Sequence, residues 1–89
     1  MKTQEVTVIN PAGLRSQRIV SILNAKANEF KSETTIRFNS RVINAKSQLG
    51  VLSGNISCGT TITLATKGED EEEALAALVL LFESGFETY

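Results

Sequence analysis

The sequence predicts a two-layer α+β domain, in which a four-stranded antiparallel sheet is covered on one face by three helices. Four short segments alternate apolar and polar residues, as the strands of a half-exposed sheet do. Three other segments carry apolar residues at the three- or four-residue spacing of helices. Their order is strand, helix, strand, strand, helix, strand, helix. The 89 residues suffice for one core, so we expect a single domain over residues 1–89.

The first strand is expected over residues 4–9, where Val6 and Val8 share one face. The run 10–13 contains Pro11 and Gly13 and ends the strand, because proline donates no ladder hydrogen bond. A helix should follow from about residue 16 to residue 30. Its expected apolar stripe consists of Ile19, Ile22, Leu23, Ala27 and Phe30.

A β-hairpin is predicted next, with strands over residues 34–38 and 41–45. Asn39 and Ser40 form its two-residue turn, since asparagine tolerates a positive φ. A short helix should then run from residue 47 to about residue 54. Serine is a favoured N-cap, so Ser47 is expected to begin this helix, with Leu49 and Leu52 on one side of it.

The fourth strand is expected over residues 61–67, and the last helix begins at Asp70. Asp70 and Glu73 have the spacing of a capping box, and the acidic run 69–73 suits the positive end of a helix dipole. Gly85 is the expected left-handed stop. The predicted buried stripe of this helix is Leu75, Leu78, Val79 and Phe82.

The residue types limit the chemistry that the chain can perform. It contains no histidine and a single cysteine, Cys58, which has no electropositive neighbours and is interpreted as inert. A Ser-His-Asp triad and a structural zinc site are therefore excluded, and the acidic run is better explained as a helix start. We expect no catalytic residue, no metal and no cofactor.

Charge and hydropathy bear on location and partners. Residues 1–46 carry eight Lys or Arg against three Glu, and residues 47–89 carry one Lys against seven Asp or Glu. The basic residues are dispersed, which favours ordinary solvated surface over nucleic-acid binding. No apolar run is long enough for a membrane span and no signal peptide is evident, so a cytoplasmic protein is expected.

Two parts of the sequence allow both a structural and a functional interpretation. Ser47 is either only a cap or also a phosphorylation site, because the positive end of the helix dipole would favour a phosphate there. Arg15 and Arg18 lie near the start of the long first helix, where cations are mildly unfavourable. They are either tolerated there or form an anion site together with Ser16 and Gln17.

The chain resembles the HPr family, the histidine-containing phosphocarriers of the bacterial sugar phosphotransferase system. The resemblance covers nearly all 89 residues and agrees in the order of elements. It is carried by the segments Asn-Ala-Lys-Ser at 44–47, Gly-Val at 50–51, Gly-Glu-Asp-Glu-Glu-Glu-Ala at 68–74 and Glu-Ser-Gly-Phe at 83–86. The resemblance implies an open-faced sandwich, in agreement with the fold class predicted above.

The family motif Gly-Leu-His-Ala-Arg-Pro corresponds to residues 13–18, which read Gly-Leu-Arg-Ser-Gln-Arg. Arg15 occupies the position of the phosphoryl-accepting histidine, Gln17 that of the active-site arginine, and Arg18 that of the proline. A protonated guanidinium has no nucleophilic lone pair. The resemblance thus points to a histidine-lacking, Crh-like member that does not relay phosphate and is not an enzyme.

The second family site is retained. In Gram-positive members a dedicated kinase phosphorylates the serine that Ser47 matches, and the phosphoprotein binds a transcription regulator in carbon catabolite control. The resemblance implies the same partners here, with Lys46, Gln48, Leu49 and Leu52 as docking residues; Gln48 and Leu49 replace two residues that are usually apolar. The alternative is an interaction protein with a phosphate-independent partner or an anion at Arg15 and Arg18. The oligomeric state is left open.

Overall fold

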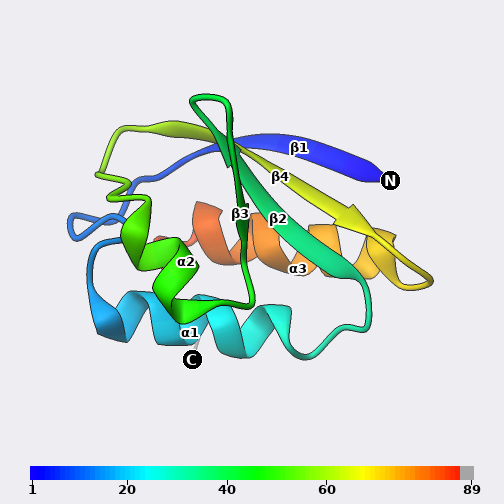
Figure 1. The fold of residues 1–89 in the computed structure, drawn as a ribbon. Helices are drawn as coiled ribbons and strands as arrows, with labels where there is room; N and C mark the ends of the chain where they lie inside the picture. Colours follow the sequence, from blue (N-terminus) through cyan, green and yellow to red (C-terminus); the bar gives the residue numbers. More distant parts are fainter. Residues whose placement is uncertain (87–89) are drawn as a thin grey trace.

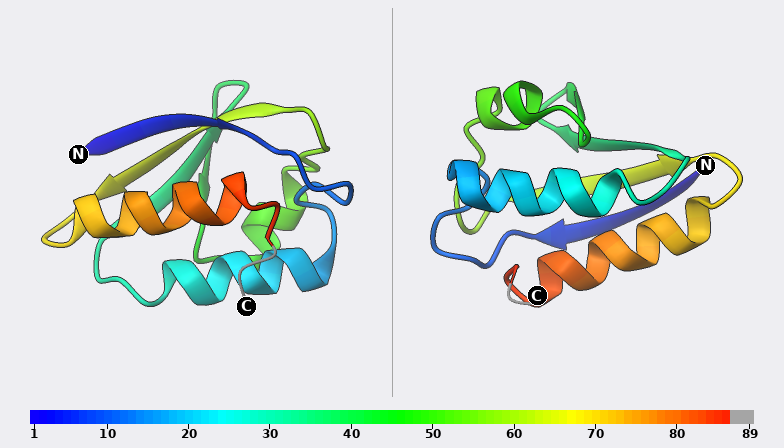
Figure 2. Two further views of the ribbon diagram at one scale, coloured as in Figure 1. Left: turned by 180° about the vertical axis from the view of Figure 1, so that it is seen from behind. Right: turned by 90° about the horizontal axis from the view of Figure 1, so that it is seen from below.

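The computed structural model describes residues 1–86 and shows the predicted architecture (Figure 1). The elements are β1 (Lys2–Thr7), α1 (Gln17–Ala27), β2 (Glu33–Phe38), β3 (Arg41–Asn44), α2 (Gln48–Ser53), β4 (Thr61–Lys67) and α3 (Glu71–Glu83). The strands form one antiparallel sheet in the order β1-β4-β2-β3. The three helices lie on one face of this sheet, as the view from below shows (Figure 2). The α+β prediction and the order of elements are confirmed.

The alternation of side chains along the strands produces the two faces of the sheet. Val6 of β1 is paired with Ile62 of β4, and Ile36 of β2 lies between Leu64 and Ile43, so the apolar residues form a row facing the helices. Residues at the intervening positions are mostly threonine or charged and face away from the helices. The largest fully buried side chains include Phe82, Phe86, Leu14, Leu23, Ile36, Ile56, Ile62, Leu64, Leu78 and Leu81.

Several predicted boundaries are corrected. β1 spans Lys2–Thr7 and not residues 4–9, although the backbones of Val8 and Thr60 continue the pairing through one hydrogen bond of 2.9 Å. α1 ends at Ala27: the Asn28 N–H still bonds to the Asn24 carbonyl four residues back, but the next two N–H groups, of Glu29 and Phe30, bond to carbonyls only three residues back. The half-buried Phe30 therefore lies beyond the helix, and its predicted place on the helical stripe is wrong.

The predicted stripes need smaller corrections. Val20 belongs to the buried face of α1 although the prediction left it out. On α3, Leu78 and Phe82 are buried as predicted, whereas Leu75 and Val79 are only half-buried. Ala74 and Leu81 complete the buried face of α3.

The hairpin turn and the end of α3 follow the predicted chemistry, whereas the capping at the start of α3 does not. Asn39 and Ser40 have φ values of 48° and 66°, which are the positive values that a tight hairpin turn requires. Gly85 has φ 69° and stops α3. The capping box is wrong: Asp70 is the N-cap of α3 but makes no side-chain cap hydrogen bond. It is Glu71 that reaches back, accepting a hydrogen bond from the Gly68 N–H at 3.1 Å.

Candidate functional site

The loop before α1 is held in place by hydrogen bonds and close packing. The buried Asn10 donates from Nδ2 to the Gly13 carbonyl at 2.8 Å, and the Leu14 N–H donates to the Ile56 carbonyl at 2.8 Å. Gly13 has φ 61°, and a Cβ there would lie 2.5 Å from the Ile56 carbonyl oxygen. Only glycine fits this position, so Gly13 and Leu14 fix where α1 begins.

The residues of the predicted anion site surround the first turn of α1. Arg15, Gln17 and Arg18 are exposed, and Ser16 is the N-cap, with an extended backbone and no side-chain cap hydrogen bond. No acidic residue lies in this turn. A shallow hollow of about 330 Å³ lies beside it and is lined in part by Ser16 and Arg18, but not by Arg15 or Gln17. The fold thus brings only half of the predicted set to one hollow.

Ser47 is the N-cap of α2, as predicted. Its Oγ accepts a hydrogen bond from the Gly50 N–H at 3.1 Å, and its carbonyl accepts one from the Val51 N–H at 3.1 Å. Asn44 orients the preceding turn, because its Oδ1 accepts from the Lys46 N–H at 2.9 Å. Gly50 keeps the surroundings of the hydroxyl open, since a Cβ there would lie 3.1 Å from Oγ.

Lys46 makes an intramolecular contact that the sequence did not reveal. Its Nζ donates to the Phe30 carbonyl at 2.8 Å, just beyond the end of α1. Nearby, Asn24 of α1 donates to the Ala45 carbonyl at 2.7 Å. These two bonds tie the end of the hairpin to α1, so the ammonium group is engaged within the domain and stabilises the position of the Ser47 turn.

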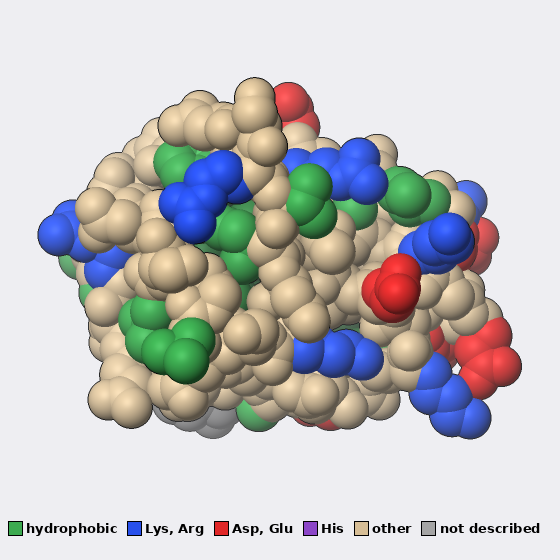
Figure 3. All heavy atoms as spheres, viewed as in Figure 1, with side chains coloured by type: hydrophobic (Ala, Val, Ile, Leu, Met, Phe, Trp, Pro, Cys, Tyr) green, Lys and Arg blue, Asp and Glu red, His purple; other side chains and the backbone are tan. Residues whose placement is uncertain are grey.

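The remaining predicted docking residues differ in exposure. Leu49 is 81% exposed, whereas Gln48 is half-buried. Leu52 is half-buried as well and packs against the core. Figure 3 shows hydrophobic side chains lying among Lys and Arg on the face that carries α2 and β3. Leu49 is therefore the main apolar group that this site offers to a partner.

Asp70 is a second organising residue, with a role other than the capping box that its spacing to Glu73 predicts. Its carboxylate accepts hydrogen bonds from the Ser32 hydroxyl and from the backbone N–H groups of Lys31 and Ser32, both at 2.9 Å. These bonds, above all that from the Ser32 hydroxyl, lower the pKa of Asp70 below its ordinary value. Local spacing could not signal this role, because the partners lie 38 and 39 residues earlier in the chain.

Other features bear on cofactors and location. Among residues 1–86, no three His, Cys, Asp or Glu side chains lie close enough together to hold a metal ion. Cys58 is exposed and lies 3.6 Å from the Ile9 carbonyl oxygen. In the same part of the chain, no helix combines the length and the apolarity that a membrane span requires.

Comparison with known proteins places this geometry in a family. The family model described as "PTS HPr component phosphorylation site" matches residues 2–84. The phosphocarrier protein HPr of Lysinibacillus sphaericus is 44% identical over 81 residues, which are 91% of each chain. The HPr-like protein Crh of Halalkalibacterium halodurans is 40% identical over 83 residues, covering 93% of this chain and 98% of that protein.

The solved structures agree with the sequence comparisons. The crystal structure of HPr-C-His from Thermoanaerobacter tengcongensis superposes with a TM-score of 0.94 at 35% identity. The match covers 100% of this chain and 99% of that one. Both the sequence and the fold are therefore shared along essentially the whole length, and the chain belongs to the HPr family.

Proposed function

We propose that this chain is a histidine-lacking, Crh-like member of the HPr family that acts in regulation and does not carry phosphate to sugar transporters. Phosphorylation of Ser47 controls it. The observation that carries the proposal is Arg15, which stands where the family motif has its phosphoryl-accepting histidine, in a chain without any histidine. A guanidinium stays protonated and offers no lone pair to phosphorus. The chain therefore has no atom that could accept the phosphoryl group as a phosphoramidate and pass it to a sugar transporter.

The surroundings of Ser47 support a role as the modified residue. Within residues 1–86 its hydroxyl accepts one hydrogen bond, from Gly50, and donates none. The exposed Leu49 lies two residues further along α2. A phosphate would add about −1.5 to −2 charges next to this apolar side chain. The resulting combination of charge and apolar surface can be recognised by a transcription regulator only after modification.

The kinase reaction tests the proposal directly. Incubation with an HPr-type serine kinase and ATP should add one phosphate to the chain, measured as intact mass. The Ser47→Ala variant should remain unmodified, whereas Ser53→Ala, which removes an exposed hydroxyl from the same helix, should be modified like the parent. An unmodified parent chain, or a phosphate retained in Ser47→Ala, would contradict the proposal.

The docking residues are tested in a second experiment with the phosphorylated protein. Leu49→Ser should weaken binding to the regulator by about tenfold, because an anchoring side chain contributes more than about 1 kcal/mol. Leu52→Ala is unsuitable as a probe of binding alone, since Leu52 packs against the core. Calorimetric titration measures the affinity, and equal affinities for the parent and Leu49→Ser would remove Leu49 from the site.

A second candidate function is supported by the first turn of α1. The N-cap Ser16 makes no cap hydrogen bond, and Ser16 and Arg18 line the hollow beside the helix start. A helix N-terminus with nearby cations favours an anion or an acidic protein surface. Titration with inorganic phosphate, followed by amide chemical shifts, should then move the signals of residues 15–18 in the Ser47→Ala variant too. If these signals do not move, the anion site at the start of α1 is excluded and only the Ser47 proposal is left.

A further inference from the structure

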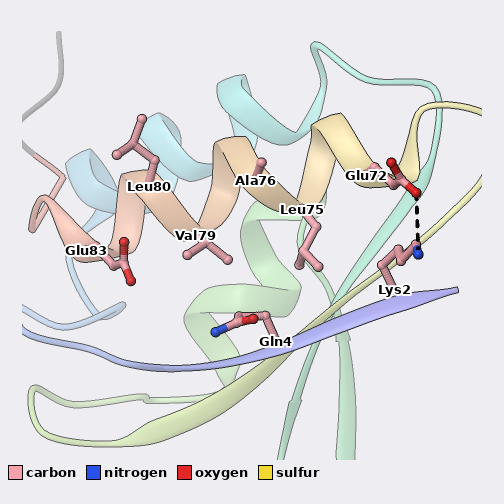
Figure 4. Close-up of a pocket in the computed structure, with 8 residues that line it drawn as sticks. All are labelled: Lys2, Gln4, Glu72, Leu75, Ala76, Val79, Leu80 and Glu83. Carbon is pink, nitrogen blue, oxygen red and sulfur yellow. Dashed lines mark ion pairs between the residues drawn. The ribbon is translucent and has the colours of Figure 1, made fainter.

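A groove between α3 and the edge strand β1 has no part in the function proposed above. It is about 530 Å³ in volume and is lined by Lys2, Gln4, Glu72, Leu75, Ala76, Val79, Leu80 and Glu83. Leu75 and Val79 point from α3 toward β1, where Gln4 lies opposite them (Figure 4). Leu80 is 62% exposed.

The groove follows from the sequence of β1. Lys2 and Gln4 share the helix-facing side of the strand with Val6, since side chains alternate and these residues are paired with Thr66, Leu64 and Ile62. Val6 covers the apolar face of α3 at one end of the strand, but two polar side chains take its place at the other end. Leu75 and Val79, which face β1, therefore remain half-buried. Leu80 also lines the groove, but its side chain points away from β1 and is exposed (Figure 4).

The open side of β1 adds hydrogen-bonding capacity to this apolar surface. Within residues 1–86, β1 pairs only with β4, so alternate backbone N–H and C=O groups of β1 point outward at the sheet edge. An extended segment can pair with them and direct every second side chain into the groove. The six residues of β1 span about 20 Å, enough for a partner segment of similar length.

The charges of the groove indicate which segment fits. Glu72 and Glu83 stand at its two ends, and residues 68–89 contain no Lys or Arg. Lys2 forms an ion pair of 3.4 Å with Glu72, but the two side chains are 48% and 78% exposed, so the pair is weak. A second copy seated through the same face would bring two acidic α3 helices together, which disfavours a symmetric dimer.

We propose that this groove binds an extended segment of a partner protein in which two alternate apolar residues are flanked by basic ones. Along α3, the 11 steps from Glu72 to Glu83 correspond to about 16 Å. In a strand this distance corresponds to about five residues. Two apolar residues and two flanking lysines or arginines share one side of a strand only when the basic residues are six positions apart, so this is the spacing expected of the partner, and the flexible basic side chains cover the small difference in length.

The probe is the blocked peptide Lys-Ser-Val-Ser-Leu-Ser-Lys, titrated into the ¹⁵N-labelled chain. Saturable shifts of the amides of β1 and α3 are expected, with a Kd of about 0.1–1 mM and weaker binding at higher salt. Two control peptides should bind at least about fivefold more weakly. One carries Glu in place of Lys, and the other has Val and Leu moved by one position, onto the opposite side of the strand.

Variants of the chain complete the test. Leu80→Ser and Glu83→Lys should each weaken binding about fivefold, whereas Val42→Thr, which alters an exposed apolar residue on β3, should not. Circular dichroism checks that each variant is folded. Ser47→Ala should bind like the parent, so a failure here is separable from a failure of the Ser47 proposal.

Two results would overturn the inference. One is the absence of shifts in β1 and α3 at millimolar peptide, or shifts that Leu80→Ser and Glu83→Lys leave unchanged. The other is self-association in sedimentation experiments that Leu80→Ser abolishes, because the occupant would then be a second copy of this chain.

Discussion

At the scale of single residues, Asp70 shows how a side chain can serve a different purpose from the one its local spacing indicates. Asp70 is the N-cap of α3 and lies three residues before Glu73, a spacing typical of a capping box. Its carboxylate instead binds the Lys31–Ser32 turn. The three donors of that turn satisfy the carboxylate better than one helix N–H would, because several hydrogen bonds stabilise its charged form.

Acid should therefore destabilise the protein through Asp70. Its pKa in the folded state lies below the ordinary value of 3.8, so its contribution is complete above that value and is lost as the pH falls through the folded-state pKa. Urea denaturation between pH 6 and pH 2.5 should show a steep loss of stability below about pH 4. Asp70→Asn should lower stability at pH 7 and flatten this loss.

Glu71 should contribute to the same loss of stability at low pH, because the Gly68 N–H and the N-terminal ammonium lower its pKa. Glu73→Gln is the control for Asp70→Asn, since it removes an exposed carboxylate from the same end of α3. If Asp70→Asn lost stability below about pH 4 as steeply as the parent, the contact of Asp70 with the Lys31–Ser32 turn would not contribute to stability.

Two serines that both begin helices give a matched pair of mutations. Ser47 accepts a cap hydrogen bond, whereas Ser16 makes none. Ser47→Ala should therefore lower the free energy of unfolding by about 1 kcal/mol, and Ser16→Ala should change it by less than about 0.5 kcal/mol. Urea denaturation at pH 7 measures both. Equal losses would mean that the cap hydrogen bond of Ser47 adds no measurable stability beyond what Ser16 contributes without one.

At the scale of elements, periodicity predicted what each segment is and the exact bounds of β4, but not where β1 and α1 end. The order of seven elements and the hairpin turn are as expected, because alternation, helical spacing and turn residues are local signals. The end of α1 depends on Asn28, and the edge groove depends on which residues of β1 lie over α3. The groove results from packing between distant segments, which spacing along the chain does not encode, whereas the hydrogen bonds that end α1 are local but are not visible in the apolar spacing.

The candidate site was predictable to a similar extent. The cap at Ser47 and the exposure of Leu49 agree with the sequence. The engagement of Lys46 by the Phe30 carbonyl and the absence of Arg15 and Gln17 from the hollow beside α1 required the structure. Long side chains such as lysine can reach partners far along the chain, so their neighbours in sequence say little about their contacts.

The loop that precedes α1 should depend on glycine at position 13. Gly13→Ala should destabilise the protein by about 3–4 kcal/mol, since it combines a positive φ with a Cβ placed 2.5 Å from the Ile56 carbonyl oxygen. Gly59→Ala is the matched control. It also has a positive φ, 93°, but its Cβ would meet nothing within 4 Å, and a loss of about 1–2 kcal/mol is expected. Thermal denaturation of the two variants measures the difference, and equal losses would mean that the loop yields to the added methyl group.

At the scale of the whole molecule, the fold pairs some basic residues of the first half of the chain with acidic residues of the second half. Three ion pairs join the basic first half of the chain to the acidic start of α3: Met1 with Glu71, Lys2 with Glu72 and Lys31 with Glu69. The carboxylate of Glu83, at the other end of α3, has no ion pair within residues 1–86. The dispersed basic residues are thus partly used inside the domain, while one end of α3 keeps a net negative charge for a partner.

The proposed function, together with the retained fold, implies that carrier activity depends on a few side chains. Gly13 and Leu14 still hold the loop before α1 against Ile56. Restoring the residues of the family motif by Arg15→His, Gln17→Arg and Arg18→Pro should therefore restore phosphoryl acceptance. Proline is tolerated in the first turn of a helix, so the third change should not disrupt α1.

Labelled phosphoenolpyruvate and the general phosphotransferase provide the measurement. The parent chain should take up no label, and the triple variant should take up label that is stable in base and lost in acid, as a phosphoramidate is. Adding Ser47→Ala to the triple variant is the control, since label on the restored histidine must be independent of the serine. Acid-labile, transferable label on the parent would contradict the proposed function. A folded triple variant that stays unlabelled would show that the partner-binding surface, and not only the acceptor atom, has diverged from that of the carriers.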